Sequence, residues 1–294
     1  MTDRAASVRH PRRVFGPRER AIFRVLWYSA NILLVLSLLT SVYALDWEYS
    51  TRRYLKGFSD AIIPEAASPR EKVDAILNWM AHGPSRLPST EGVGDARNPN
   101  DTLNYAALLQ VCGSATNAFL NLANSEGLSA RRLLLLNSSD GLTKHVVAEV
   151  LLDGRWVIVD PAFRTTFSDP NGNLLTRAQL ADPTIFRSAT AIVPNYTFTY
   201  NDAIHVRVGR LRRLGRWMAT ILDRIVPNWD ETPLVSLILE RESLAALALS
   251  VALLLSLLVL RWMLRRYGEV RFGFRSMRVR EQLRRATAAF LEAA

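Results

Sequence analysis

Two long apolar segments limit what this chain can fold into more than any other feature of its sequence. The first, Val25–Leu45, contains no charged residue, and the second, Ser243–Leu264, contains only Arg261, near its C-terminal end. A helix of about 20 apolar residues is long enough to cross the hydrocarbon core of a bilayer. We therefore predict two transmembrane helices, residues 25–45 and 243–264, joined by a long connecting region.

Most of the positive charge lies outside these two segments. The chain has a net charge of +10, and arginines crowd the N-terminal flank, residues 1–24, and the C-terminal flank, residues 265–294. Because arginine-rich flanks stay in the cytoplasm, we expect both ends of the chain there and the connecting region on the outer side of the membrane. A nucleic-acid-binding protein carries such charge on a folded face. We therefore expect the lipid bilayer, and no nucleic acid, as the partner of these flanks.

The first apolar segment has an alternative interpretation as a cleaved signal peptide. Val42–Ala44 fits the pattern of a cleavage site. The apolar run is longer than the apolar region of a usual signal peptide, which favours an uncleaved anchor.

The connecting region begins with a helix whose two ends are marked in the sequence. Ser68 and Glu71 form the capping-box pattern around Pro69. Gly83, followed by a second proline, ends this helix.

Two more helical stretches follow a polar loop. The first includes Leu103 and Leu109, and the second begins at Cys112 and runs to about Ser125. Gly127 supplies the C-terminal stop of the second stretch.

The pattern then changes from helix to strand. The segment ARRLLLL, residues 130–136, is a short apolar run, and two further strands flank Asp153-Gly154, a dipeptide that favours a two-residue hairpin turn. In such a hairpin, His145 and Asp160 become diagonal neighbours on one face, roughly 7–8 Å apart at the backbone. The hairpin therefore predicts that Asp160 orients the imidazole of His145.

Cys112, the only cysteine of the chain, stands where a predicted helix begins. Backbone N–H groups at a helix N-terminus stabilise an anion, and a neighbouring imidazolium lowers the pKa of a thiol further. An unpaired thiol outside the cytoplasm is exposed to oxidation, which argues against a purely structural role. These features predict a nucleophilic Cys–His–Asp site.

The order of these features resembles the transglutaminase-like superfamily. A cysteine opens a helix, an ARR strand follows, a histidine opens the next strand, and the motifs DGRW and VDPAF complete a pattern that extends from about Ser68 to Phe163. The resemblance implies a papain-like α+β fold that carries out acyl transfer through a thioester. It assigns the nucleophile to Cys112, the general base and acid to His145, and the orienting carboxylate to Asp160.

Three further residues are candidates for supporting roles. The oxyanion donor of the family is often an aromatic or amide side chain, and Tyr105 and Gln110 are the candidates here. Glu149 shares a strand face with His145 and either supports the site or forms a buried salt bridge. No metal or organic cofactor is expected, because the remaining histidines are isolated and no CxxC motif is present.

The whole chain is therefore predicted to hold an α+β, papain/transglutaminase-like domain between two transmembrane helices. Residues 46–202 form this domain, on the outer side of a bacterial inner membrane, and residues 203–242 form a basic amphipathic helix and a linker. The amphipathic helix either lies in the membrane interface or packs on its own domain.

The predicted reaction is attack on an amide bond of a peptide or protein outside the cytoplasm, through a thioester on Cys112. Hydrolysis is favoured because water is the default acceptor, and transfer to an amine would use the same intermediate. The alternative is a catalytically inactive module of the same fold, which binds a peptide or an envelope polymer and scaffolds an envelope complex.

Overall fold

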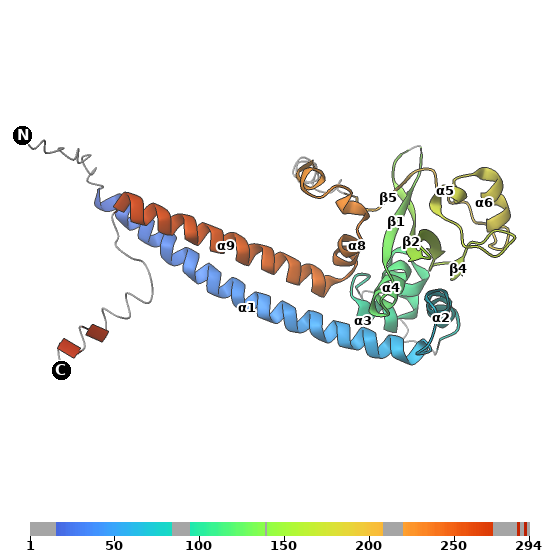
Figure 1. The fold of residues 1–294 in the computed structure, drawn as a ribbon, viewed down its shortest axis with the longest axis horizontal. Coiled ribbons are helices and arrows are strands. Elements are labelled where there is room, and N and C mark those ends of the chain that lie inside the picture. Colours follow the sequence, from blue (N-terminus) through green and yellow to red (C-terminus); the bar gives the residue numbers. More distant parts are fainter. Residues whose placement is uncertain are drawn as a thin grey trace, which may run out of the picture. The chain divides into compact units, whose positions relative to one another are not determined.

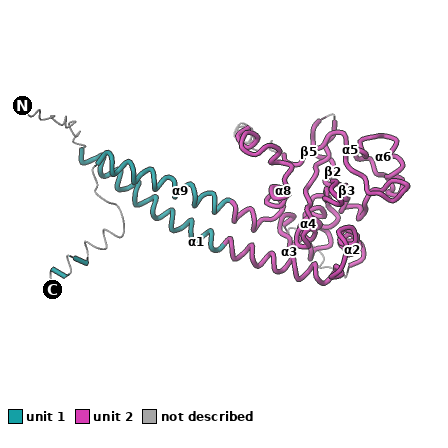
Figure 2. The backbone as a smooth tube through the Cα atoms, viewed as in Figure 1, with its two compact units in different colours: residues 1–43, 249–294 teal, residues 44–248 magenta. Residues whose placement is uncertain are grey.

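The computed structural model describes residues 16–83, 95–138, 140–207, 220–272, 287–288 and 291–292. It divides into two units, one made of residues 1–43 and 249–294 and the other of residues 44–248 (Figure 2). The elements in chain order (Figure 1) are α1 Pro17–Ile62, α2 Pro69–His82, α3 Pro99–Asn104, the 3₁₀ helix η1 Ala106–Gln110, α4 Cys112–Ser125, β1 Ala130–Leu136, β2 Thr143–Leu152, β3 Arg155–Asp160, β4 Thr165–Thr166, α5 Arg177–Leu180, α6 Pro183–Thr190, β5 Ala203–Ile204, the 3₁₀ helix η3 Trp229–Glu231, α8 Pro233–Glu240 and α9 Glu242–Phe272.

Among the described residues, two helices, α1 and α9, are long and apolar enough to cross a membrane, by length and composition. Each contains one predicted span, 25–45 or 243–264, and continues beyond it. The first proline after Pro17 is Pro64, just beyond the end of α1, so no proline stops the helix at the end of the span. Within the first unit, Phe23 of α1 packs against Tyr267 of α9, with ring centroids 6.3 Å apart.

The second unit is built on a five-stranded antiparallel sheet with the strand order β4-β3-β2-β1-β5. Its β2 and β3 form the predicted hairpin, in which Leu152 pairs with Arg155. Asp153 and Gly154 have φ angles of 48° and 75°, because the favoured two-residue hairpin turn needs positive φ at both positions. The observed register confirms the predicted two-residue turn.

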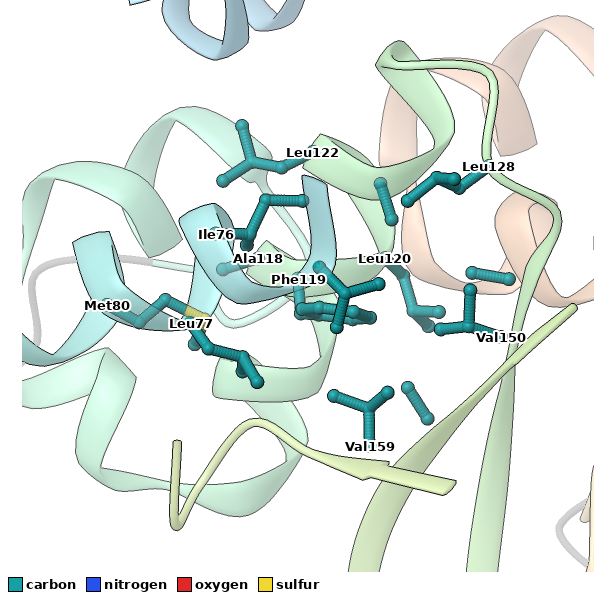
Figure 3. Close-up of a cluster of buried hydrophobic side chains, with 14 of the residues drawn as sticks. Ile76, Leu77, Met80, Ala118, Phe119, Leu120, Leu122, Leu128, Val150 and Val159 are labelled. Carbon is teal, nitrogen blue, oxygen red and sulfur yellow. The ribbon is translucent and has the colours of Figure 1, made fainter. Parts of the chain in front are cut away.

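Alternate residues of the strands contribute to two separate cores, because successive side chains point to opposite faces of a sheet. Ala148 and Val150 of β2 belong to a core shared with α2 and α4, in which Phe119 is fully buried (Figure 3). Val147, on the other face, belongs to a second core shared with α5, α6 and residues 196–200. The first core holds α4, the helix that begins with the cysteine, against the sheet.

Local signals placed two helices correctly. At the start of α2 the backbone N–H of Ser68 donates to Glu71 Oε2 at 2.7 Å, and the reciprocal bond completes the predicted capping box. The helix α4 runs from Cys112 to Ser125, and Gly127 follows with a φ of 77°.

The stretch around Leu103 and Leu109 differs from the single helix that was predicted. The helix α3 ends at Asn104, and Tyr105 has an extended backbone with φ −101° and ψ 116° before η1 begins. The side-chain amide of Asn104 donates to the carbonyl oxygen of Asn100 at 2.7 Å. Asparagine favours such local side-chain bonds over continuation of a helix.

The sheet extends past residue 202, where the domain was predicted to end. Leu134 of β1 pairs with Ile204 of β5, so the first residues of the predicted linker are part of the sheet. The predicted basic amphipathic helix falls mainly on residues 208–219, which lie outside the described residues.

Candidate active site

Hydroxyl side chains hold the first turn of α4 in place. Ser114 Oγ donates to the carbonyl oxygen of Leu108. Thr116 is fully buried and donates from Oγ1 to the carbonyl oxygen of Val146 in β2, at 3.1 Å. The N-terminal end of α4, where Cys112 lies, is therefore fixed beside the beginning of β2.

Cys112 is the first residue of α4 and is half-buried. Its sulfur accepts hydrogen bonds from the side chain of His145 and from the backbone N–H groups of Val146 and Gly113. The hydrogen bond with His145 is the main cause that lowers the pKa of the thiol, although burial opposes it. A lowered pKa increases the fraction of thiolate, which is the nucleophilic form of cysteine.

The imidazole of His145 lies between Cys112 and Asp160. Its Nε2 donates to Asp160 Oδ2 at 2.7 Å, which leaves Nδ1 for the sulfur. His145 is 3% exposed and Asp160 is fully buried. Burial alone would lower the pKa of His145, but the hydrogen bonds with Asp160 and Cys112 outweigh it and raise this pKa to about 9. The structure thus brings the three predicted residues into one hydrogen-bonded row, the Cys–His–Asp cluster.

The carboxylate of Asp160 is fixed by its own local sequence. Asp160 is the last residue of β3, and Pro161 follows it. Its Oδ1 accepts hydrogen bonds from the backbone N–H groups of Ala162 at 3.1 Å and Phe163 at 3.2 Å. Aspartate commonly bonds to the backbone N–H groups that follow it in a turn. The motif DPAF therefore orients the carboxylate that meets the histidine.

Aromatic side chains surround the ring of His145. Phe198 stacks on it, with ring centroids 4.0 Å apart and an angle of 13° between the planes. Phe163 and Tyr196 meet the imidazole edge-on, with centroids 5.7 and 6.1 Å away. Neither Phe198 nor Tyr196 was predicted from the sequence to be part of the site. The only signal was an aromatic residue at every second position from Tyr196 to Tyr200, and no sequence rule connects that pattern to the hairpin.

The two predicted oxyanion donors lie in the chain just before Cys112. Tyr105 is half-buried between α3 and η1, and Gln110 is exposed at the end of η1. Within the described residues, neither side chain is hydrogen-bonded to the sulfur of Cys112. The backbone N–H of Cys112 is another donor at the same place, because N–H groups in the first turn of a helix have no acceptor within the helix.

Glu149 belongs to a different cluster of polar side chains. Its Oε2 accepts hydrogen bonds from Arg131 Nε at 2.7 Å and from His205 Nε2 at 2.8 Å. Burial acts to raise the pKa of Glu149, but these two partners lower it. The three side chains line a cavity of about 550 Å³ together with Trp156, on which the guanidinium of Arg131 stacks. Of the two roles predicted for Glu149, the structure shows the buried salt bridge.

No three His, Cys, Asp or Glu side chains are grouped to hold a metal ion in the part of the chain that the structure describes.

In this site a cysteine opens a helix, and the helix packs on an antiparallel sheet that bears a histidine and an aspartate. This is the arrangement of the papain-like cysteine enzymes. Residues 56–161 match the family model of the transglutaminase-like superfamily. The chain therefore carries a transglutaminase-like domain, and the resemblance expected from the sequence is confirmed. The matched residues include Cys112, His145 and Asp160, and they end before Tyr196. No curated protein matches the chain, and no solved structure does.

Proposed function

We propose that this protein is a membrane-anchored cysteine enzyme that cleaves an amide bond through a thioester on Cys112. The observation that carries the proposal is the hydrogen-bonded row of Cys112, His145 and Asp160, in which the pKa of the thiol is lowered and the pKa of the imidazole is raised. A thiolate next to an imidazolium supplies a nucleophile and a proton donor in one site.

In the first half of the proposed reaction, the thiolate of Cys112 attacks the carbonyl carbon of the amide, and the carbonyl electrons move to oxygen. We assign the stabilisation of this oxyanion to the backbone N–H of Cys112, with Tyr105 or Gln110 as the second donor. The imidazolium of His145 then gives its proton to the amide nitrogen, the oxyanion electrons re-form the carbonyl as the C–N bond breaks, and the amine leaves the thioester behind. Asp160 holds the ring and stabilises its charge.

In the second half, the neutral imidazole of His145 takes a proton from water while the water oxygen attacks the thioester carbon. The C–S bond breaks, the acid product leaves, and Cys112 returns as a thiolate beside an imidazolium. An amine in place of water would give a new amide by the same steps. Hydrolysis is the proposed outcome because water is the more abundant acceptor.

The first experiment is the rate of alkylation of Cys112 by iodoacetamide as a function of pH, on the full chain in detergent micelles. Cys112 is the only thiol, so the rate reports on one site. We expect fast alkylation well below the ordinary thiol pKa of about 8.5, and a loss of at least about tenfold near neutral pH in His145→Ala. His82→Ala, at an exposed histidine of α2, is the matched control and should behave as wild type.

An ordinary thiol pKa in both wild type and His145→Ala would contradict the proposal. The domain would then be better explained as a catalytically inactive module that binds a peptide or an envelope polymer.

We also propose that α1 and α9 anchor the enzyme in a bacterial inner membrane, with the Cys–His–Asp cluster on the outer side. The support is the apolar composition of the two helices and the arginine-rich flanks of the chain. A membrane-impermeant maleimide should label Cys112 in right-side-out vesicles and leave it unlabelled in sealed inverted vesicles, with Cys112→Ala as the blank. Labelling only in inverted vesicles would reverse the proposed orientation.

A further inference from the structure

A short segment outside the matched family residues covers the Cys–His–Asp cluster. This segment, the aromatic loop, consists of residues 196–200 and forms neither helix nor strand. Its three aromatic residues alternate with threonines. Phe198 stacks on His145, while Tyr196 and Tyr200 are buried in the second core of the sheet, at 8% and 1% exposed.

The aromatic loop also completes the hydrogen bonding of Asp160. Tyr196 Oη lies 2.9 Å from Asp160 Oδ2, the same oxygen that accepts the hydrogen bond from His145 Nε2. A carboxylate only accepts hydrogen bonds, so the Tyr196 hydroxyl is the donor. Tyr200 Oη lies 2.6 Å from Tyr196 Oη, and Tyr196 has no second proton to give, so Tyr200 donates to Tyr196. The result is a directed chain from Tyr200 through Tyr196 to Asp160.

Both hydroxyl groups keep their protons over the pH range in which the cluster titrates. Burial, together with the nearby charge of Asp160, raises the pKa of Tyr196 well above the ordinary tyrosine value. Burial likewise raises the pKa of Tyr200. The two tyrosines therefore act as fixed neutral donors and do not titrate together with Cys112 and His145.

We propose that Tyr196 is a positioning residue whose hydroxyl group holds Asp160 Oδ2 against His145 and draws negative charge away from that oxygen. The inference rests on the proposed function of Cys112 as a thiolate nucleophile. When two donors bind the same carboxylate oxygen, each hydrogen bond is weaker than it would be if that donor were the oxygen's single partner. Tyr196 therefore limits how strongly Asp160 stabilises the imidazolium, which in turn lets His145 release its proton to the leaving amine.

In the part of the chain that the structure describes, the titratable groups around His145 come from three elements. The helix α4 supplies Cys112, β3 supplies Asp160, and the aromatic loop supplies Tyr196. The guanidinium of Arg164, which follows closely in the chain, is bound to two backbone carbonyl oxygens and not to this carboxylate. Of the groups that touch Asp160, the Tyr196 hydroxyl can be removed without changing any charge.

The test is the pH dependence of Cys112 alkylation by iodoacetate, on the full chain in detergent micelles. This anionic reagent reacts best when the thiolate and the imidazolium are both present, so its rate rises with the ionisation of Cys112 and falls with the deprotonation of His145. In Tyr196→Phe we expect the falling limb to move to higher pH by about half a unit, because Asp160 then binds the imidazolium more strongly. Tyr200→Phe is the matched control, and it should shift this limb in the same direction by less than half as much.

A falling limb of Tyr196→Phe that superimposes on wild type, or that moves to lower pH, would overturn the inference. A bell-shaped wild-type profile with either of these results would leave the proposed function intact. An ordinary thiol profile in the wild type would instead reject the proposed function itself.

If Tyr196→Phe does not fold, a second variant tests the same role of the Tyr196 hydroxyl. Difluorotyrosine placed at position 196 keeps the ring and the hydroxyl but makes the hydroxyl a stronger donor. It should move the falling limb to lower pH, opposite to Tyr196→Phe. A shift to higher pH, or no shift, would count against the proposed role.

Discussion

From the described residues, Asp160 accepts four hydrogen bonds, two on each carboxylate oxygen. Oδ1 binds the backbone N–H groups of Ala162 and Phe163, and Oδ2 binds His145 and Tyr196. A fully buried carboxylate held in this way cannot rotate without breaking several bonds at once. Its negative charge therefore stays next to the imidazole Nε2.

Replacing this charge by a neutral amide tests its contribution. In Asp160→Asn the imidazolium loses its counter-charge, so we expect the pKa of His145 to fall toward the ordinary value of about 6.5 and the pKa of Cys112 to rise. A hydrogen bond to a charged group is worth about 1.5–3 kcal/mol, which corresponds to a loss of about 10- to 100-fold in alkylation rate by iodoacetate near neutral pH.

Asp153→Asn is the matched control for this prediction. It makes the same chemical change at the exposed turn of the hairpin, where asparagine also tolerates a positive φ, and should leave the alkylation rate unchanged. Equal rates for Asp160→Asn and wild type would show that the charge of Asp160 does not act on the thiol.

Among the elements, those set by local rules were predicted well. The capping box of α2 and the Asp153-Gly154 turn depend on residues close together in the chain, and the turn alone placed His145 and Asp160 on one strand face. The meeting of Cys112 with this hairpin could be inferred only from the family resemblance. It depends on the packing of α4 through Phe119 and other buried side chains, which no local pattern encodes.

The elements that were missed depend on long-range contacts. The strand β5 is two residues long and is recognisable as a strand only because it pairs with β1. The aromatic loop has no regular structure, yet Phe198 and Tyr196 complete the surroundings of His145. The break between α3 and η1 at Tyr105 was missed because the apolar spacing on both sides fits a helix.

At the scale of the whole molecule, a buried polar network joins three segments that are far apart in the sequence. Glu48 of α1 and Arg241, just before α9, are each 2% exposed. Arg241 donates to Glu48 Oε1 at 2.9 Å and to Asn121 Oδ1 of α4 at 2.8 Å, and Ser243 Oγ donates to Glu48 Oε2 at 2.7 Å. The helix that begins with Cys112 is thus bonded to the segments that lead into both apolar spans.

Removing one partner of this network should be costly. Glu48→Gln leaves the buried guanidinium of Arg241 without its counter-charge, and we expect a loss of about 3–5 kcal/mol in the free energy of unfolding. The thermal unfolding midpoint in detergent measures this loss. Asp60→Asn, which makes the same change in an exposed ion pair of α1 with Lys56, should cost less than about 1 kcal/mol.

The double variant Glu48→Gln with Arg241→Met removes the unpaired charge together with its partner. It should recover part of the stability that Glu48→Gln loses, because an apolar side chain carries no desolvation penalty. A double variant less stable than Glu48→Gln would show that the network contributes more than charge balance.

The same network decides where the protein can be divided into an independently expressed piece. The family match covers residues 56–161, whereas Glu48 lies before it and Arg241 and Ser243 lie far after it. A fragment trimmed to the match would expose Asn121 and the core that Leu55 fills, and it would omit the aromatic loop. Soluble production of this domain for crystallisation or inhibitor screening should therefore start before Glu48 and end after Ser243, with the apolar spans removed at those points.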